Sequence, residues 1–392
     1  MITKPNIETV KFIREHYNDD LPILALHREK YKSIDIDFVL QEIGSRIKLE
    51  KKMPDWVENY DLLMPKPVYI EQSSSCYTSK FKFDLFPYID SIDLTCGFGI
   101  DSFYMASNST QHIAIEPSDD ICPIVAHNFR TLGFTNTDVI CTTAEHFLER
   151  NETVFDMVYL DPSRRSKSGS RKILIEDYHP DITAIFQDLK RISRRLMIKL
   201  SPMLDITALV NLFPEVNKIY VLSVDGECKE LLLVFDFVSL IKGVSYHAVE
   251  LTENKFEYIF EKDDELEIDY GIPQQYLYDV HPAIMKSGFH DSYAMSLGLM
   301  KISRNSHLYT SDILLNNFSG KIYEMISSAR PNQKDLESVL RDMKAIVIRK
   351  DFPLTAESIR AKFKISEGKD ITLFAVKLLS DKNSFLIARR LR

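Results

Sequence analysis

A turn rich in glycine directly follows a short apolar run that ends in an acid. The run Ile92-Asp93-Leu94 leads into Thr95-Cys96-Gly97-Phe98-Gly99. Glycine allows a tight turn and a close approach of the backbone to a ligand, and a helix beginning after it would offer free N–H groups. A dinucleotide-binding turn needs a further glycine where Ser102 stands, so that motif is not met. The pattern predicts a site for a cofactor with an amino-acid group, whose ammonium Asp93 could meet; the alternative is a turn without a ligand.

A second acid stands at the end of the next apolar run. The run His112–Ile115 leads into Glu116 and Pro117, and Glu116 lies 17 residues after Gly99. A carboxylate at this distance from a glycine turn can accept two hydrogen bonds from a ribose diol, each worth about 1.5–3 kcal/mol. The alternative is that Glu116 caps the helix that follows.

A third candidate site follows the apolar run Phe155–Leu160, which leads into Asp161-Pro162-Ser163-Arg164. Strand ends in open parallel sheets face the ligand crevice. The Asp-Pro pair resembles the Asp-Pro-Pro-aromatic motif of amino-group methyltransferases, in which the acid and the next carbonyl accept hydrogen bonds from the target amine. We therefore predict that Asp161 and Pro162 are catalytic. Ser163 replaces the second proline, and Arg164 replaces the aromatic residue that would stack on a base.

Basic residues dominate the stretch after this motif. A loop of this kind beside a methyl donor could hold RNA phosphates, and the alternative is a solvated loop without a ligand. No cysteine stands in this loop or in the run Leu196–Leu200, so carbon-5 methylation of pyrimidines, which normally needs a thiolate, is disfavoured. The predicted substrate-binding residues are Arg164, Arg165, Lys167, Arg171 and Lys172.

These candidates need a sheet whose strands end at a common edge. Short apolar runs alternate with amphipathic stretches of helix length, which predicts a mostly parallel sheet with helices on both faces. The last two runs are separated only by Ser223–Lys229, too short for a crossover helix, so they should pair antiparallel. Seven strands with an antiparallel last pair are typical of class I methyltransferases rather than nicotinamide dehydrogenases. The predicted strands are Ile89–Leu94, His112–Ile115, Asp138–Cys141, Phe155–Leu160, Leu196–Leu200, Lys218–Leu222 and Glu230–Phe235, with helices in Asp101–Ser107, Asp119–Leu132, Ala144–Arg150 and Glu176–Arg191.

In methyltransferases the loop after the third strand faces the adenine ring, often through an acid. Here the loop holds Thr143 and Ala144. Thr143 can hydrogen-bond adenine but is equally good as a helix N-cap, so we expect a backbone N–H near Ala144 to matter more. The predicted cofactor site consists of Asp93, Thr95, Cys96, Gly97, Gly99, Glu116, Pro117, Thr143 and Ala144.

Segments of another kind flank the predicted sheet. The N-terminal segment reads as helical, and Asp37 is a plausible N-cap for a helix from Phe38. The C-terminal segment has the pattern of a small α+β region. We predict a helical region at 1–68, a catalytic domain at 69–240, a small ferredoxin-like or connecting region at 241–320 and a basic domain at 321–392. Strands are expected in that last part at Ala345–Arg349, Ile371–Ala375 and Phe385–Arg389, with a helix at Ala356–Phe363.

Composition excludes several classes of protein. The chain has 392 residues, of which 45% are hydrophobic and 27% charged, the balance of an ordinary globular protein. It has no apolar run of about 18 residues that could span a membrane and no apolar signal core at its N-terminus, so we expect a cytoplasmic protein. The five cysteines are widely spaced, which favours reduced thiols over a disulfide framework. The sequence lacks CxxC and HExxH patterns, and His281, His290 and His307 match no ligand spacing, so no metal is expected.

The sequence resembles a bacterial family of class I S-adenosylmethionine-dependent methyltransferases with a C-terminal THUMP-like domain. The resemblance spans most of the chain. It implies a helical N-terminal region, a Rossmann-like catalytic domain, a small ferredoxin-like segment and a THUMP-like end. Related THUMP domains bind RNA, which points to tRNA or rRNA. The matching residues are Glu71–Ser75, Asp93–Asp101, Asp161–Arg165, Glu227–Glu230, Pro282–Lys286 and Ser306–Asp312.

The leading interpretation is a methyltransferase that uses S-adenosylmethionine to methylate a nitrogen of a tRNA or rRNA base by direct transfer. One alternative is a non-catalytic RNA-binding protein on a methyltransferase scaffold. The other is a methyltransferase that acts on a protein or a small molecule.

The net charge of −8 argues against nucleic acid only if it is evenly spread. Residues 321–392 hold 16 Lys and Arg against 9 Asp and Glu, a net of +7, whereas residues 1–320 have a net of −15. A basic end on an acidic body permits RNA binding by the C-terminal domain and the loop after Asp161. The basic end could equally dock on the acidic body.

Overall fold

The computed structural model describes residues 5–164, 175–239, 243–252, 254–261 and 268–391. The chain divides into two compact units, the first holding Met1–Ile219 with Glu230–Val244 and the second Tyr220–Lys229 with Ser245–Arg392. This division is coarser than the four regions predicted from the sequence, which stay predictions.

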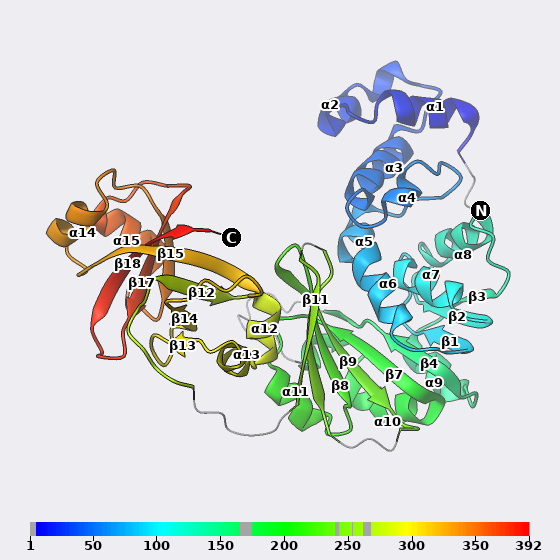
Figure 1. Ribbon diagram of the computed structural model, residues 1–392. Helices are drawn as coiled ribbons and strands as arrows, with labels where there is room; N and C mark the ends of the chain where they lie inside the picture. The colour runs from blue at the N-terminus through cyan, green and yellow to red at the C-terminus, as the bar shows by residue number, and fades with distance from the viewer. Residues whose placement is uncertain (1–4, 165–174, 240–242, 253, 262–267, 392) are drawn as a thin grey trace. The chain divides into compact units, whose positions relative to one another are not determined.

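Helices occupy the N-terminal part of the first unit (Figure 1). The N-cap predicted for the longest of these helices, α3 (Ile36–Leu49), is wrong by two positions. The carboxylate of Asp35, not of Asp37, accepts a hydrogen bond from Phe38 N at 3.0 Å, so Asp37 lies within the first turn. These helices are α1 (Ile7–Glu15), α2 (Leu21–Leu26), α3 (Ile36–Leu49), α4 (Pro54–Val57), α5 (Pro67–Gln72) and α6 (Cys76–Asp84).

A mostly parallel sheet follows, as predicted. Strand β1 pairs parallel with β2 and β4, and β4 pairs parallel with β7. Strand β9 pairs antiparallel with β7, and the turn Asp225-Gly226, with φ values of +52° and +73°, joins β8 to β9. A connection of two residues with positive φ is typical of a tight antiparallel hairpin. The seven predicted strands correspond to β1 (Asp90–Asp93), β2 (Gln111–Glu116), β3 (Thr137–Cys141), β4 (Phe155–Leu160), β7 (Ser193–Leu200), β8 (Lys218–Val224) and β9 (Glu227–Asp236).

The sheet is larger than the seven strands expected. Within the described residues it has nine, in the order β11-β10-β8-β9-β7-β4-β1-β2-β3. The additional strands are β10 (Ser245–Glu250) and β11 (Phe256–Glu261), which pair antiparallel. Strand β11 alternates partly buried and exposed residues, and its two acids, Glu257 and Glu261, lie on the exposed face.

The helices α7, α8 and α9 lie at the predicted stretches, whereas the helix before β7 starts later and the helix between β7 and β8 was not predicted. Helix α10 begins at Ile182 rather than Glu176, because the carboxylate of Asp181 caps it and Pro180 precedes that cap. A short 3₁₀ turn covers Ile175–Asp177. The helices of this layer are α7 (Ile100–Ser107), α8 (Cys122–Thr131), α9 (Ala144–Arg150), α10 (Ile182–Ile192) and α11 (Ile206–Leu212).

One pair of cysteines contradicts the expectation of reduced thiols. Cys122 and Cys141 form a disulfide, with their Cα atoms 5.8 Å apart. Cys122 begins α8 and Cys141 ends β3, so a pair separated by 19 residues in the chain meets where the helix packs on the strand. Cys76, Cys96 and Cys228 are free thiols.

The second unit contains another sheet, with the strand order β13-β14-β12-β15-β18-β17-β16. The three strands and the helix predicted near the C-terminus are present as β16, β17, β18 and α15. A core that includes Leu336, Ile359, Leu373 and Phe385 fills the space between this sheet and its helices. The elements are β12 (Tyr276–Val280), β13 (Met300–Lys301), β14 (Leu308–Ser311), β15 (Gly320–Ala329), β16 (Ile346–Lys350), β17 (Ile371–Lys377), β18 (Asn383–Arg390), α12 (Pro282–Ser287), α13 (His290–Ser296), α14 (Gln333–Val339) and α15 (Ala356–Phe363).

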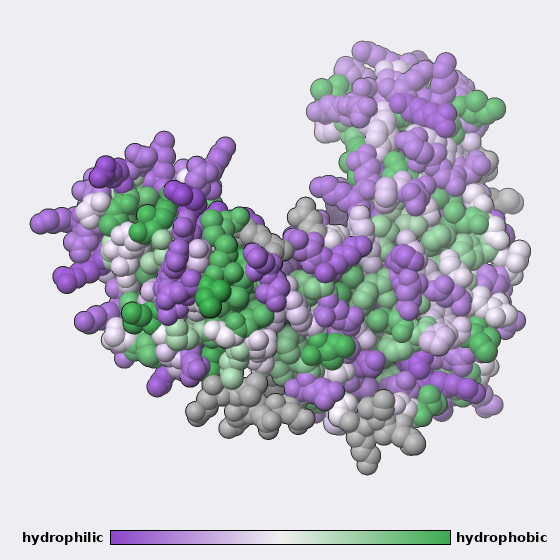
Figure 2. Space-filling model, in the orientation of Figure 1, coloured by the Kyte–Doolittle hydropathy of each residue, from purple (hydrophilic) through white to green (hydrophobic). Residues whose placement is uncertain are grey.

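Hydrophilic side chains cover most of the N-terminal helices in the view of Figure 2. Ile7 and Leu26 are apolar exceptions, at 89% and 81% exposed. Across the part of the chain that the structure describes, no helix combines the length and apolar character needed to cross a bilayer.

Candidate active site

The glycine turn lies between the end of β1 and the start of α7. Gly97 and Gly99 have φ values of +55° and +92°, which side chains other than glycine rarely adopt. A Cβ added at Gly97 would meet no atom within 4 Å, whereas one at Gly99 would lie 3.2 Å from the ring of Phe129. Gly97 therefore borders open space, and Gly99 packs against the helix layer.

Glu116, at the end of β2, holds this turn directly. Its Oε2 accepts a hydrogen bond from Gly97 N and its Oε1 accepts one from Ser118 N, both at 2.9 Å. The carboxylate thus joins the glycine turn to the segment that follows β2. It does not cap α8, whose N-cap is Ile121. Burial raises its pKa, and the two backbone N–H groups oppose that rise.

Asp93, at the end of β1, is fully buried. Its two oxygens accept hydrogen bonds from Thr95 N at 2.9 Å and Ser102 Oγ at 2.6 Å. Burial raises its pKa to about 7, against the effect of these two bonds. In this arrangement Asp93 connects β1 to α7 beneath the turn; a carboxylate oxygen has a second lone pair that a cofactor ammonium could still use.

Asp161, at the tip of β4, is fixed from two sides. Its backbone N donates to Thr95 Oγ1 at 2.6 Å, and its Oδ2 lies 2.6 Å from Nζ of Lys199, a residue of β7. The side chains of Asp161 and Lys199 are 28% and 11% exposed. Burial by itself would lower the pKa of Lys199, but the carboxylates of Asp161, Glu230 and Asp101 outweigh burial and raise it. Lys199 is therefore an ammonium. Burial raises the pKa of Asp161, and the charge of Lys199 opposes that rise.

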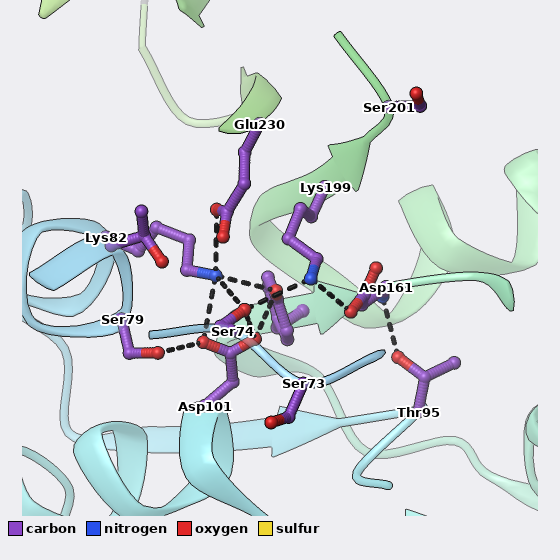
Figure 3. A network of polar contacts seen from close by, with 12 residues as sticks. Ser73, Ser74, Ser79, Lys82, Thr95, Asp101, Asp161, Lys199, Ser201 and Glu230 are labelled. Atoms are coloured by element: carbon purple, nitrogen blue, oxygen red, sulfur yellow. Dashed lines mark hydrogen bonds and ion pairs between the residues drawn. The ribbon is translucent and has the colours of Figure 1, made fainter. Parts of the chain in front are cut away.

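A buried network continues from this pair (Figure 3). Ser74 Oγ lies 3.1 Å from Lys199 Nζ and 3.0 Å from Lys82 Nζ. Lys82 is fully buried, and its Nζ lies 2.8 Å from Asp101 Oδ1 and 3.1 Å from Glu230 Oε2. Two ammonium groups are thus interleaved with three carboxylates.

Asp101 is the most heavily hydrogen-bonded acid of the network. It accepts from Ser79 Oγ at 2.6 Å, from Ser74 Oγ at 2.7 Å and from Tyr159 Oη at 2.7 Å. Burial alone would raise its pKa, but Lys82 and Lys199 reverse that effect and lower it. A buried charge of this kind is stable only because the groups bonded to it are hydrogen-bond donors and a cation.

The candidate residues of the next loop behave as local structure. Thr143 caps α9, since its side chain accepts from His146 N at 3.2 Å. Ala144 is buried and Pro117 is exposed. This geometry matches the N-cap alternative for Thr143 and leaves the role of Ala144 N untested.

The structure places only part of the predicted substrate loop. Pro162 is buried, and Arg164 is exposed in β5 (Ser163–Arg164), which pairs with β6 (Tyr178–His179). Arg165, Lys167, Arg171 and Lys172 lie outside the described residues. Among the residues that are described, no group of three or more His, Cys, Asp or Glu side chains could hold a metal ion.

Sequence reasoning missed the residues that connect these parts: Ser74, Ser79, Lys82, Asp101, Tyr159, Lys199 and Glu230. Ser74, Asp101 and Glu230 stand inside the motifs that carry the family resemblance, which was an available signal. Lys82 and Lys199 lie within a helix and a strand, where an isolated lysine normally indicates a surface position.

Comparisons with known proteins agree with this architecture. Residues 276–318 match a family model described as a ferredoxin-like domain, and residues 320–390 match one described as THUMP domain-like. Among the curated proteins, none matches the chain.

A solved structure from Porphyromonas gingivalis W83, provisionally assigned as a methyltransferase, has 27% sequence identity to this chain. It covers 98% of both chains with a TM-score of 0.84. An rRNA methylase from Streptococcus thermophilus covers 44% of this chain and 98% of its own, at 16% identity and a TM-score of 0.31, too remote to support an argument. The chain therefore combines a class I methyltransferase fold with a C-terminal THUMP-like domain.

Proposed function

We propose that this protein is an S-adenosylmethionine-dependent methyltransferase that methylates a nitrogen of an RNA base. The observation that carries the proposal is the position of Asp161. Thr95 of the glycine turn and Lys199 of β7 hold it at the tip of β4, beside the turn expected to bind the methyl donor. The likeness over nearly the whole chain to the Porphyromonas protein supports the same activity.

The residues around the glycine turn fit the cofactor. Open space borders Gly97, and the acids at the ends of β1 and β2 suit an ammonium and a ribose diol. Asp93, Thr95, Cys96, Gly97, Gly99, Glu116, Pro117, Thr143 and Ala144 would hold it. When bound, S-adenosylmethionine supplies an activated methyl group on a sulfonium.

The chain's own residues would then position the acceptor. Asp161 and the Pro162 carbonyl accept N–H hydrogen bonds from the target nitrogen and aim its lone pair at the methyl carbon. With S-adenosylmethionine bound, this nitrogen would take the methyl group from the sulfonium, and Asp161 or water would accept the proton that the nitrogen releases. Lys199 favours the ionised form of Asp161, against the effect of burial. Most of the rate comes from alignment.

RNA is the proposed acceptor because of the basic end and the THUMP-like match. The target base would have to be single-stranded or flipped out, at a cost of a few kcal/mol. Comparing digested tRNA and rRNA from a deletion strain and its parent by mass spectrometry tests this choice. Loss of one methylated nucleoside is expected, and an unchanged set would exclude RNA as substrate.

The altered motif favours one competing proposal, a non-catalytic RNA-binding scaffold, because Ser163 stands in place of the second proline and Arg164 in place of the aromatic residue. Calorimetry with S-adenosylmethionine separates the two. The enzyme should bind it, and Glu116→Ala should weaken binding by about 10–100-fold through one or two lost charged hydrogen bonds. Glu149→Ala, on the exposed face of α9, is the matched control. A wild-type protein with no affinity for the cofactor would support the scaffold.

A further inference from the structure

A cavity of about 950 Å³ lies within the second unit. Its size is in the range of sites that enclose a small organic ligand. The turn Asp225-Gly226, strand β11, the start of α12, the start of β15 and the ends of β16 and β18 all contribute to it. It therefore draws on both the ferredoxin-like and the THUMP-like segments and on strands that neither match covers.

The lining of this cavity is strongly basic. It includes the lysines 255, 286, 321 and 350 together with Arg390, against two carboxylates, Asp225 and Asp279. Lys350 Nζ lies 2.6 Å from Asp279 Oδ1, so one of these carboxylates is already neutralised within the wall. Lys255, Lys321 and Arg390 are exposed. The surplus of positive charge calls for an anionic ligand.

Aromatic side chains form another part of the wall. Phe256 and Tyr258 are half-buried, and their rings lie 5.0 Å apart. Tyr258 Oη lies 3.0 Å from Ser319 Oγ, and the ring of His281 meets Phe256 edge-on at 4.9 Å. These contacts hold the rings in place, and aromatic faces of this kind stack well on bases.

The floor of the cavity is closely packed. Gly320 has a φ of +147°, and a Cβ there would lie 2.3 Å from the carbonyl oxygen of Asp279. Only glycine fits at this point, so β12 and β15 approach closely beneath the ligand space.

We propose that this cavity binds a nucleotide, with its phosphate at Lys321 and Arg390 and its base at the Phe256 and Tyr258 wall. The combination of a cationic rim and half-buried rings matches the two parts of a nucleotide, and guanidinium groups bind phosphate bidentately. The nucleotide could be free or part of an RNA strand. The site goes beyond the proposed methyl transfer and does not require it.

Arg390 and its neighbour Arg389 provide a matched pair of variants. Both are exposed and lie next to each other in β18, so their side chains point to opposite faces. Arg390 lines the cavity and Arg389 does not. Arg390→Ala and Arg389→Ala remove the same charge from the same strand.

The test measures binding of a fluorescently labelled single-stranded RNA 8-mer by anisotropy. The salt concentration is varied from about 50 to 200 mM to obtain the slope of log affinity against log salt concentration. Arg390→Ala should weaken binding about 10-fold at the low-salt end and reduce the log–log salt slope by roughly 0.7, the value for one phosphate contact on a single strand. Arg389→Ala should stay within about twofold of the wild type by the same reasoning. Lys321→Ala should behave like Arg390→Ala. Equal losses for Arg390→Ala and Arg389→Ala, or no loss for either, would overturn the proposal.

Competition with the four nucleoside monophosphates shows whether the cavity binds a free nucleotide or a nucleotide of an RNA strand. Displacement of the 8-mer by a monophosphate shows that a free nucleotide suffices, and failure of all four while the Arg390 effect persists shows that the nucleotide must belong to RNA. Calorimetry with S-adenosylmethionine on the same variants keeps the two proposals apart. RNA binding that depends on Arg390 in a protein without cofactor affinity would sustain the nucleotide site and refute the methyltransferase.

Discussion

At the scale of single residues, the candidate site depends on lysines that neutralise buried acids. Lys199 holds Asp161, and Lys82 holds Asp101 and Glu230, with Ser74 between the two lysines. A carboxylate removed from water keeps its charge only beside such a partner. Burial raises the pKa of Asp161, and Lys199 of β7 is the main group that opposes this rise.

Replacing Lys199 by methionine should lower kcat by about 10²-fold, the loss typical of removing one preorganised charge. Burial already raises the pKa of Asp161, and loss of the ammonium would raise it further and move the acid limb of the pH–rate profile to higher pH. Cofactor affinity should stay within about twofold, because Lys199 lies outside the cofactor residues. The rate of methyl transfer measured across pH tests the shift of the acid limb. The control is Lys80→Met, which replaces an exposed lysine of α6. An unshifted profile would show that Lys199 does not act through Asp161.

His112 gives a prediction about stability. It is buried in β2, its Nδ1 lies 2.8 Å from Ser91 Oγ, and burial lowers its pKa from 6.5 to about 3. Below pH 6.5 the unfolded chain binds a proton at this ring that the folded chain does not. The free energy of unfolding should therefore fall as the pH drops from 6.5 toward 3, by up to about 1.4 kcal/mol per pH unit from this group.

Urea unfolding at several pH values measures that slope. His112→Gln should flatten it within this window, whereas His146→Gln, on the exposed face of α9, should leave it as in the wild type. Equal slopes for the wild type and His112→Gln would contradict the pKa shift.

At the scale of elements, most of the sheet could be predicted because its strands are short apolar runs between amphipathic stretches. The start of α10 could not, since Glu176 continues a plausible pattern and only the cap at Asp181 ends it. Strand β11 was not assigned to the sheet, because its pairing with β10 is a tertiary contact. Alternation of apolar and polar residues indicates a half-buried strand but does not identify the strand that it pairs with.

The disulfide between α8 and β3 is an element-scale feature with a measurable effect. Closing a loop of this length stabilises a folded chain by about 3 kcal/mol through the entropy of the unfolded state. Cys122→Ser should lower the free energy of unfolding by about 2–4 kcal/mol, and Cys228→Ser, at a half-buried free thiol, should have a smaller effect.

Denaturant titration measures both variants, and counting thiols in the unfolded, unreduced protein checks the bond itself. Cys76, Cys96 and Cys228 should react. Reaction of all five cysteines would show that Cys122 and Cys141 are reduced. The expectation of reduced thiols, drawn from the spacing of the cysteines, would then be correct.

At the scale of the whole molecule, the net charge of −8 conceals a basic end of +7 on a body of −15. If RNA binds chiefly at the basic end, its affinity should fall steeply with salt, by roughly 0.7 log units per log unit of salt for each phosphate contacted. Cofactor affinity should depend little on salt, because the acids that would hold it are buried.

Filter binding of RNA and calorimetry of the cofactor over the same salt series test this contrast. An RNA affinity independent of salt would show that RNA does not bind chiefly at the basic end. Deletion of residues 321–392 is a poor substitute for this measurement, since β12 lies between β14 and β15 and would lose its pairing on one side.

The sequence by itself determined the class of fold, the glycine turn, Glu116 and the Asp-Pro tip, because all of these are contained in short contiguous motifs. Only the tertiary structure decided that Lys82, Lys199, Ser74 and Glu230 meet Asp101 and Asp161, and that Cys122 meets Cys141. Residues far apart in the chain come together through the crossing of helices and strands, and no local pattern records which of them will share one buried space. The ionisation of a buried acid depends on those neighbours, so the chemistry of the site follows from the packed chain.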